Sequence, residues 1–221
     1  MMQASKQENP VLEPLRARLR AEIWKVAEGD PAPLFPLARA LGAHFHLSFN
    51  NRLLVAVQAP TALRVKNPRQ WGFLGYHPRP GAEGVVITGS RDQGFAPTRL
   101  YSEAEVGASA EAVRLRADIL GASLGLENPD AKAFLWEGVK WMQNHLGHAR
   151  NPKLWEELKM AELWMALKAL EGVLGQPSTP DLDRAMVERA YGQRPALLVR
   201  SLERVAAAVD GLNRRLGLGW K

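Results

Sequence analysis

Between residues 64 and 79 the sequence alternates cationic side chains with aromatic rings. Arginine and lysine can follow phosphates while exposed rings stack on unpaired bases, a combination that binds single strands with little sequence preference. Tyr76 and His77 fall in a Gly/Pro-rich turn, so we expect both to be exposed. The candidate contacts of this stretch are Arg64, Lys66, Arg69, Trp71, Tyr76, His77 and Arg79, with Phe73 as a further ring.

A second group of polar candidates lies on the apolar segment 44–58, for which we expect a helix. Asn51 and Gln58 are seven residues apart and therefore share one helix face. The functional interpretation of Asn50, Asn51 and Gln58 is contact with sugar or base, and Arg52 is a further candidate for DNA binding. The structural alternative for the amides is hydrogen bonding to the backbone of adjacent turns. Trp71 has a similar alternative, as core packing between the strands and this helix.

The net charge of the chain is concentrated in one segment. The formal charge is +6 and the pI about 9.8. Residues 44–100 contain seven Lys/Arg and two Asp/Glu, whereas residues 101–221 contain equal numbers of each sign. This asymmetry favours a polyanionic partner at residues 44–100. The alternative is a moderately basic surface without a partner.

Other kinds of chemistry lack the residues they need. The chain has no cysteine, which excludes disulfides, thiolate zinc sites and cysteine nucleophiles. It also lacks a Walker-type phosphate loop, a dinucleotide-binding glycine motif and a Gly-x-Ser-x-Gly elbow. No apolar run is long enough to span a bilayer, and the polar N-terminus is not a signal peptide. We therefore expect a cytoplasmic protein that is not an enzyme and uses no cofactor.

The stretch from Leu47 to Ile87 resembles the N-terminal single-stranded DNA-binding domain of the ArdC-type antirestriction family. The match follows that family's order of positions without gaps. Four positions depart from the pattern: Leu47 replaces a tyrosine, and Tyr76, Pro80 and Glu83 replace basic residues. The matching residues are Ser48, Asn51, Leu53, Leu54, Gln58, Pro60, Val65, Trp71, Leu74, Gly75, Gly81, Gly84 and Ile87.

The resemblance implies single-stranded DNA binding, followed in the family by a zinc metallopeptidase-like domain with a His-Glu-x-x-His helix. None of the five histidines here is followed by glutamate. His145 and His148 are three residues apart near the end of a predicted helix. Glu162 is the candidate for the family's downstream glutamate ligand. Nothing supplies the catalytic base, so we expect no metal site and a peptidase domain that is absent or degenerate.

The elements that must position these residues can be read from periodicity and from capping signals. Three helices should start at a capping residue followed by proline: Asn128-Pro129, Asn151-Pro152 and Thr179-Pro180. The expected strands are short runs between glycines and prolines, at 62–65, 84–88 and 98–101. The expected helices span 10–28, about 31–41, 44–58, 129–146, 152–174, 180–191 and 195–216.

These elements predict an α+β fold in which N-terminal helices pack on a small antiparallel sheet and an all-helical C-terminal half follows. We expect a nucleic-acid-binding domain over 1–101 and a helical domain over 102–221. The leading hypothesis is a single-stranded DNA-binding protein acting in antirestriction or as a replication accessory of a mobile element. The alternative is an adaptor whose tryptophan-rich helices, with Trp136, Trp141, Trp155 and Trp164, bind a DNA-processing protein; a divergent metal-dependent hydrolase is a third.

Overall fold

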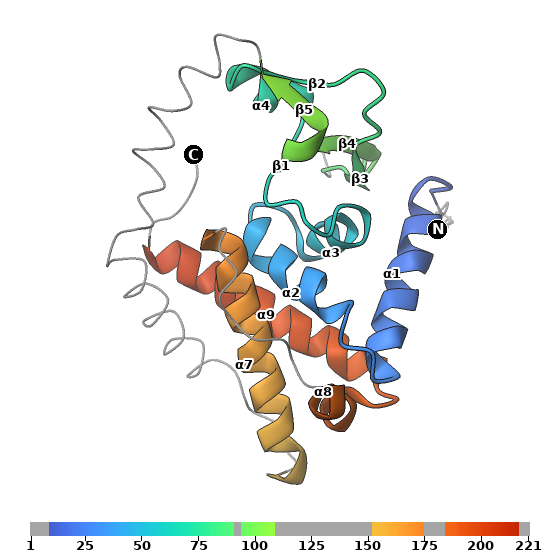
Figure 1. Ribbon diagram of the computed structural model, residues 1–221, viewed down its shortest axis with the longest axis vertical. Coiled ribbons are helices and arrows are strands. Elements are labelled where there is room, and N and C mark those ends of the chain that lie inside the picture. Colours follow the sequence, from blue (N-terminus) through green and yellow to red (C-terminus); the bar gives the residue numbers. More distant parts are fainter. Residues whose placement is uncertain (1–8, 91–93, 109–151, 175–183, 217–221) are drawn as a thin grey trace, which may run out of the picture.

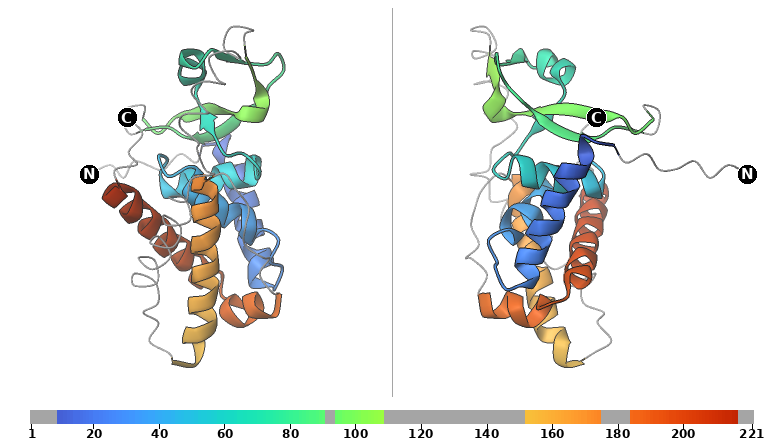
Figure 2. Two further views of the ribbon diagram at one scale, coloured as in Figure 1. Left: turned by 60° about the vertical axis from the view of Figure 1, so that its left-hand side comes forward. Right: turned by 90° about the vertical axis from the view of Figure 1, so that its right-hand side faces the viewer.

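A computed structural model describes residues 9–90, 94–108, 152–174 and 184–216 of the chain. Helices build one layer, and two small antiparallel sheets lie at one end of it (Figures 1 and 2). This arrangement confirms the α+β prediction. The helices of the main layer are α1 (Leu12–Ala27), α2 (Leu34–Ala43), α3 (Phe49–Gln58), α7 (Pro152–Leu174), α8 (Arg184–Tyr191) and α9 (Pro195–Leu216).

The strands form a three-stranded sheet in the order β1-β4-β3 and a two-stranded sheet of β2 and β5. Val65 of β1 lies opposite Ser102 of β4, and Tyr76 of β2 lies opposite Ala108 of β5. A short helix, α4 (Pro68–Phe73), connects β1 to β2. The strands are β1 (Val65–Lys66), β2 (Tyr76–Pro78), β3 (Val85–Thr88), β4 (Pro97–Ser102) and β5 (Val106–Ala108), with a 3-10 turn, η2 (Glu103–Glu105), before β5.

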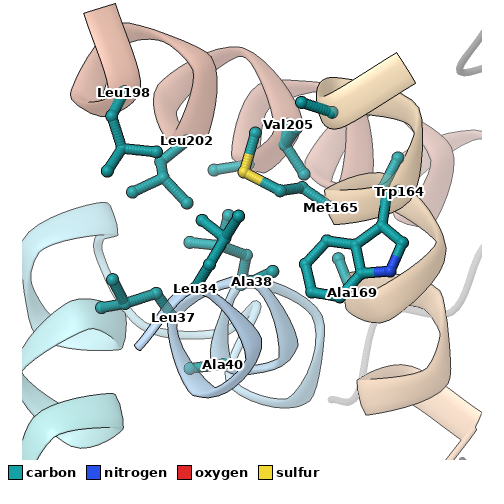
Figure 3. Close-up of a cluster of buried hydrophobic side chains, with 14 of the residues drawn as sticks. Leu34, Leu37, Ala38, Ala40, Trp164, Met165, Ala169, Leu198, Leu202 and Val205 are labelled. Atoms are coloured by element: carbon teal, nitrogen blue, oxygen red, sulfur yellow. The ribbon is translucent and has the colours of Figure 1, made fainter. Parts of the chain in front are cut away.

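The main core lies among the helices, and α2 is at its centre (Figure 3). Leu34 and Ala38 of α2 face Met165 of α7 and Leu202 of α9, and all four are fully buried or nearly so. The apolar positions of α9 share one face and are all buried: Leu198, Leu202, Val205, Val209 and Leu212. Residues from both sides of position 101 share this core, and the division into two domains at that position stays a prediction.

Two smaller clusters attach the sheets. One places Val55 of α3 against Val85, Ile87 and Leu100 of the three-stranded sheet. The other contains Trp71, Tyr76 and Val106, with Tyr101 packed against it. The α4, β2 and β5 segment is consequently the part of the molecule farthest from α8 (Figures 1 and 2).

Several expected boundaries need correction. Residues 68–73 form a helix rather than part of a turn between strands, because Asn67 caps it in a reciprocal box with Gln70. The segment 103–108 is not helical as predicted, since its 3-10 turn leads directly into β5. The third helix begins at Phe49 rather than at 44, and the first strand begins at Val65 rather than at 62. The predicted helix 129–146 lies outside the described residues.

Candidate nucleic-acid interface

The short helix α4 exposes an aromatic ring beside a guanidinium group. Phe73 is 77% exposed and Leu74 is 50% exposed, whereas large apolar side chains elsewhere mostly pack inward. The guanidinium carbon of Arg69 lies 5.6 Å from the centroid of the Phe73 ring, within cation–π range. We call Arg69, Phe73 and Leu74 the α4 platform. It offers an apolar face and a positive charge at one place.

Two further polar side chains, an imidazole and a guanidinium, follow the platform on β2 and in the loop after it. His77 and Arg79 are exposed. A Cβ placed on Gly72 of α4 would lie 4.0 Å from Cε1 of His77, so this imidazole is adjacent to the platform helix. The Arg79 side chain passes over β5, with its Cγ 3.7 Å from a Cβ placed on Gly107. The structure thus gathers Arg69, Phe73, His77 and Arg79 around α4, β2 and β5.

The other two rings of this stretch face inward. Trp71 is 4% exposed, and its indole Nε1 donates a 2.8 Å hydrogen bond to the carbonyl oxygen of Tyr101. Tyr76 is 9% exposed and packs edge to face on Trp71, with ring centroids 5.7 Å apart. The expected exposure of Tyr76 is therefore wrong. Trp71 is packed in a core, as its structural alternative states, but its neighbours are Tyr76, Val106 and Tyr101 rather than the helix of segment 44–58. These rings fix α4 on the β2–β5 sheet.

Two acidic side chains hold the neighbouring loops through backbone N–H groups. The Glu103 carboxylate accepts bonds from Leu63 N at 2.7 Å and Arg64 N at 3.0 Å. Glu105 accepts from Gly84 N, Ser102 N and Ser102 Oγ. Burial opposes the charge of Glu105, but these bonds and the nearby Arg99 leave its pKa below the ordinary value. Both carboxylates thus accept hydrogen bonds from backbone N–H groups close to the strands β1, β3 and β4.

Arg64 and Lys66 flank Val65 of β1 and are half-buried. Burial, followed by the charge of Arg64, lowers the pKa of Lys66. The two cations are therefore close enough to repel each other, and a phosphate between them would relieve that repulsion.

Asn51 and Gln58 use their amides to complete the free edge of β3. Asn51 Nδ2 donates to Thr88 O at 2.8 Å, while its Oδ1 accepts from Thr88 N at 3.0 Å. Gln58 repeats the pattern on Val86, with distances of 2.8 and 2.9 Å. Because they bind alternate residues of β3, the two side chains imitate a neighbouring strand. Their shared helix face was predicted, but the backbone that they bind belongs to a strand rather than to adjacent turns.

We predict that Asn51→Ala lowers stability without weakening nucleic-acid binding. The change leaves the N–H and carbonyl of Thr88 without partners, at a cost of about 1–3 kcal/mol. Urea unfolding followed by circular dichroism measures this loss. The neighbouring Asn50 is exposed, and Asn50→Ala should change the unfolding free energy by less than about 0.5 kcal/mol. Weaker nucleic-acid binding by folded Asn51→Ala would instead return this residue to the interface.

Arg52 is buried and points into the protein. Its guanidinium donates to the carbonyl oxygens of Leu41, Phe45 and Leu47 and pairs with Asp210 of α9 at 2.8 Å. The prediction that Arg52 binds DNA is therefore wrong, because its side chain is 4% exposed and its donors are used within the protein. Of the four polar candidates on this segment, Asn50 alone is exposed.

Glu162, the described member of the three metal candidates, takes part in an ion pair between α7 and α9. Its Oε1 accepts from Ser201 Oγ at 2.7 Å and from Arg204 Nε at 2.9 Å. His145 and His148 lie outside the described residues. Within the part of the chain that the structure describes, no three His, Asp or Glu side chains are grouped to hold a metal ion.

The structure does not describe the side chains of most of the tryptophans proposed to bind a protein partner. Trp136 and Trp141 fall outside the described residues, and the side chain of Trp155 is not described. Trp164 is 8% exposed and packs in the helical core (Figure 3). In the described ranges, no helix combines the length and apolar character needed to cross a membrane.

Comparisons of the chain with protein-family models, curated proteins and solved structures find no match. Sequence reasoning included Phe73 among the rings but not among its main candidates. The spacing of Arg69 and Phe73, four residues apart, would have indicated a shared face once residues 68–73 were recognised as a helix.

Proposed function

We propose that this chain binds DNA, prefers single strands and reads little sequence. The α4 platform carries the proposal, because it presents an exposed ring with a cation over its face. Single-strand binding needs such rings as stacking surfaces and cations to follow the phosphates. The resemblance of residues 47–87 to the ArdC-type domain supports the same choice. We place the protein in the cytoplasm, in antirestriction or as a replication accessory of a mobile element.

The preference for single strands follows from the shape of the ligand's bases. A base in a duplex is stacked on both sides, so its face is not free to contact Phe73. An unpaired base can lie on that ring, and each such stack contributes about 1–3 kcal/mol. Leu74, beside Phe73, extends the apolar surface available to the base.

The phosphates would be followed by cations on both sides of α4. Arg64 and Lys66 precede the helix, Arg69 lies on it, and Arg79 follows it. If these four side chains neutralise about four phosphates, the logarithm of the binding constant should fall with the logarithm of salt concentration with a slope of roughly −3. Arg52 contributes nothing to this count, because it is buried.

We predict that Phe73→Ala weakens single-strand binding by about tenfold or more, since it removes one base stack. Fluorescence anisotropy of a labelled oligonucleotide at low salt measures the affinity. Phe73 is 77% exposed, so the variant should fold as the wild type does. Phe73→Trp retains a ring and should retain affinity.

Phe95 provides the matched control for this experiment. It is 56% exposed but lies in the β3–β4 loop rather than on α4, so Phe95→Ala should leave affinity unchanged. Equal losses in the two variants would mean that the platform is not the stacking site. Absence of single-strand binding at low salt would overturn the proposed function itself.

A further inference from the structure

Residues 44–48 connect α2 to α3 and also connect the two main hydrophobic clusters. Phe45 packs on the core among the helices. Leu47, two residues later, packs on the cluster between α3 and the three-stranded sheet. The turn is held by the Leu47 amide, which donates to His44 O at 2.8 Å, and by Arg52, which binds the carbonyls of Phe45 and Leu47. Helix α3 also joins the two clusters, with Leu53 and Ala56 in one and Val55 in the other, so opening this turn would remove one of two connections between them.

His44 begins the turn and has no exposed surface. Within the described part of the chain, neither of its ring nitrogens has a hydrogen-bond partner of normal geometry. His46 of the same turn is edge-on to the His44 ring, with 6.4 Å between the ring centroids. A neutral imidazole avoids placing a charge in this site, whereas an imidazolium would be buried there without a carboxylate partner of its own.

The charged and titratable groups that face His44 do not compensate for a proton. Arg39 of α2, His46 of the turn and Arg52 of α3 all disfavour the protonated ring. The nearby carboxylate on α9, Asp210, is paired with Arg52. The backbone of Ala62 is the group that favours protonation, and its influence is smaller than that of burial.

Burial first, then His46, lowers the pKa of His44 from its ordinary 6.5 to about 3. An exposed ring in an opened turn takes up a proton near the ordinary value instead. The stability of the closed turn is therefore complete above about pH 6.5 and falls as the pH falls toward 3. Between about pH 7.5 and pH 5, opening becomes about 30-fold more favourable.

We propose that residues 44–48 form an acid-sensitive hinge, in which proton uptake by His44 opens the turn and loosens the sheets from the helical layer before the helical core unfolds. The proposal does not depend on nucleic-acid binding. It concerns how the two sheets, next to which the α4 platform lies, are attached to the helices.

Amide hydrogen exchange on the full chain without ligand tests the hinge. After correction for intrinsic rates, protection of Phe45, Leu47 and the β1–β4 amides should fall by about 30-fold from about pH 7.5 to pH 5. The amides in the middle of α9, around Val205, should keep their protection. Unchanged protection throughout, or an equal loss in α9, would overturn the proposal.

Two variants identify the group responsible. His44→Leu keeps the site filled and cannot take a proton, so the pH dependence should become much smaller. The remainder comes from His46, whose pKa is lowered by burial and then by the charges of Lys66 and Arg52. His46→Asn, in the same turn, should leave most of that dependence in place. If His44→Leu does not fold, nuclear magnetic resonance of the wild type provides the test, through the pH dependence of the ring signals of His44. Titration of that ring near pH 6.5 within the intact fold would refute the hinge, because the proton would then be accommodated without opening.

Discussion

Arg52→Ala should lower the free energy of unfolding by about 3–5 kcal/mol, because it leaves three carbonyl oxygens without their donor, at about 1–3 kcal/mol for each buried group. The guanidinium makes four contacts, to three carbonyl oxygens and to Asp210. Alanine removes all four donors at once and leaves a cavity where the side chain lay. The carbonyls lose their partners in a region that admits little water, which makes the loss larger than for a surface ion pair.

The position of Arg52 explains why removing this one side chain should lower the free energy of unfolding so strongly. Leu41 O belongs to the last turn of α2, where carbonyls have no partner within the helix. A cation at that end also interacts favourably with the helix dipole. The same guanidinium reaches the 44–48 turn and α9, so it joins three elements of the core.

Urea unfolding followed by circular dichroism measures the loss, with two variants for comparison. Asp210 is 39% exposed, and Asp210→Asn removes the charge alone, so it should cost only about 1 kcal/mol. Arg52→Lys keeps the charge but lacks the planar fork that reaches several carbonyls, so it should lie close to the alanine variant. An alanine variant as stable as Asp210→Asn would show that the three carbonyl contacts contribute little.

The local capping signals explain why most helices of the main layer could be predicted. Pro152 and Pro195 start helices as expected, and α8 ends at Tyr191, directly before Gly192. The helix α4 carries the same signature, Asn67-Pro68, and also Gln70 at the position that completes a capping box. The surrounding glycines and prolines favour a turn in that stretch, but the capping box determines the local structure.

The sequence predicts which segment contains the candidate site, but it does not predict which side chains of that segment form the exposed surface. Alternation of cations and rings marks residues 64–79, yet it cannot say which rings face outward. In α4, Arg69 and Phe73 are one turn apart, while Trp71 lies on the opposite side and is buried. The roles of Arg52, Asn51 and Gln58 depend on partners far along the chain, such as Asp210 and Thr88. No local pattern encodes these partners.

Gly42→Ala should destabilise the protein by about 3 kcal/mol, although alanine is the better helix former. A Cβ at Gly42 of α2 would overlap the carbonyl of Ala169 in α7, and would lie 2.5 Å from its carbon atom. The contact is with backbone, which cannot rotate away as a side chain can. The two helices would have to separate, and the packing of Ala38 and Met165 beside them would loosen (Figure 3).

At the same helix crossing, α7 also has no room for a side chain where it meets α2. A Cβ on Gly172 of α7 would overlap the carbonyl oxygen of Arg39 and lie 2.9 Å from the nitrogen of Ala43. Gly172→Ala should therefore cost about as much as Gly42→Ala. The double variant should cost less than the sum, because one separation of the helices relieves both overlaps. Additive losses would mean that each residue acts locally, without movement of the helices.

Gly72→Ala, in α4, isolates helix propensity from packing. The nearest atom to a Cβ there is Cε1 of His77 at 4.0 Å, which is ordinary contact. This variant should be stabilised by up to about 1 kcal/mol, the usual gain of alanine over glycine in a helix. The same chemical change thus has opposite signs in α4 and in α2. Urea unfolding of the three single variants tests that contrast, and a gain at Gly42 would show that α2 and α7 do not cross in backbone contact.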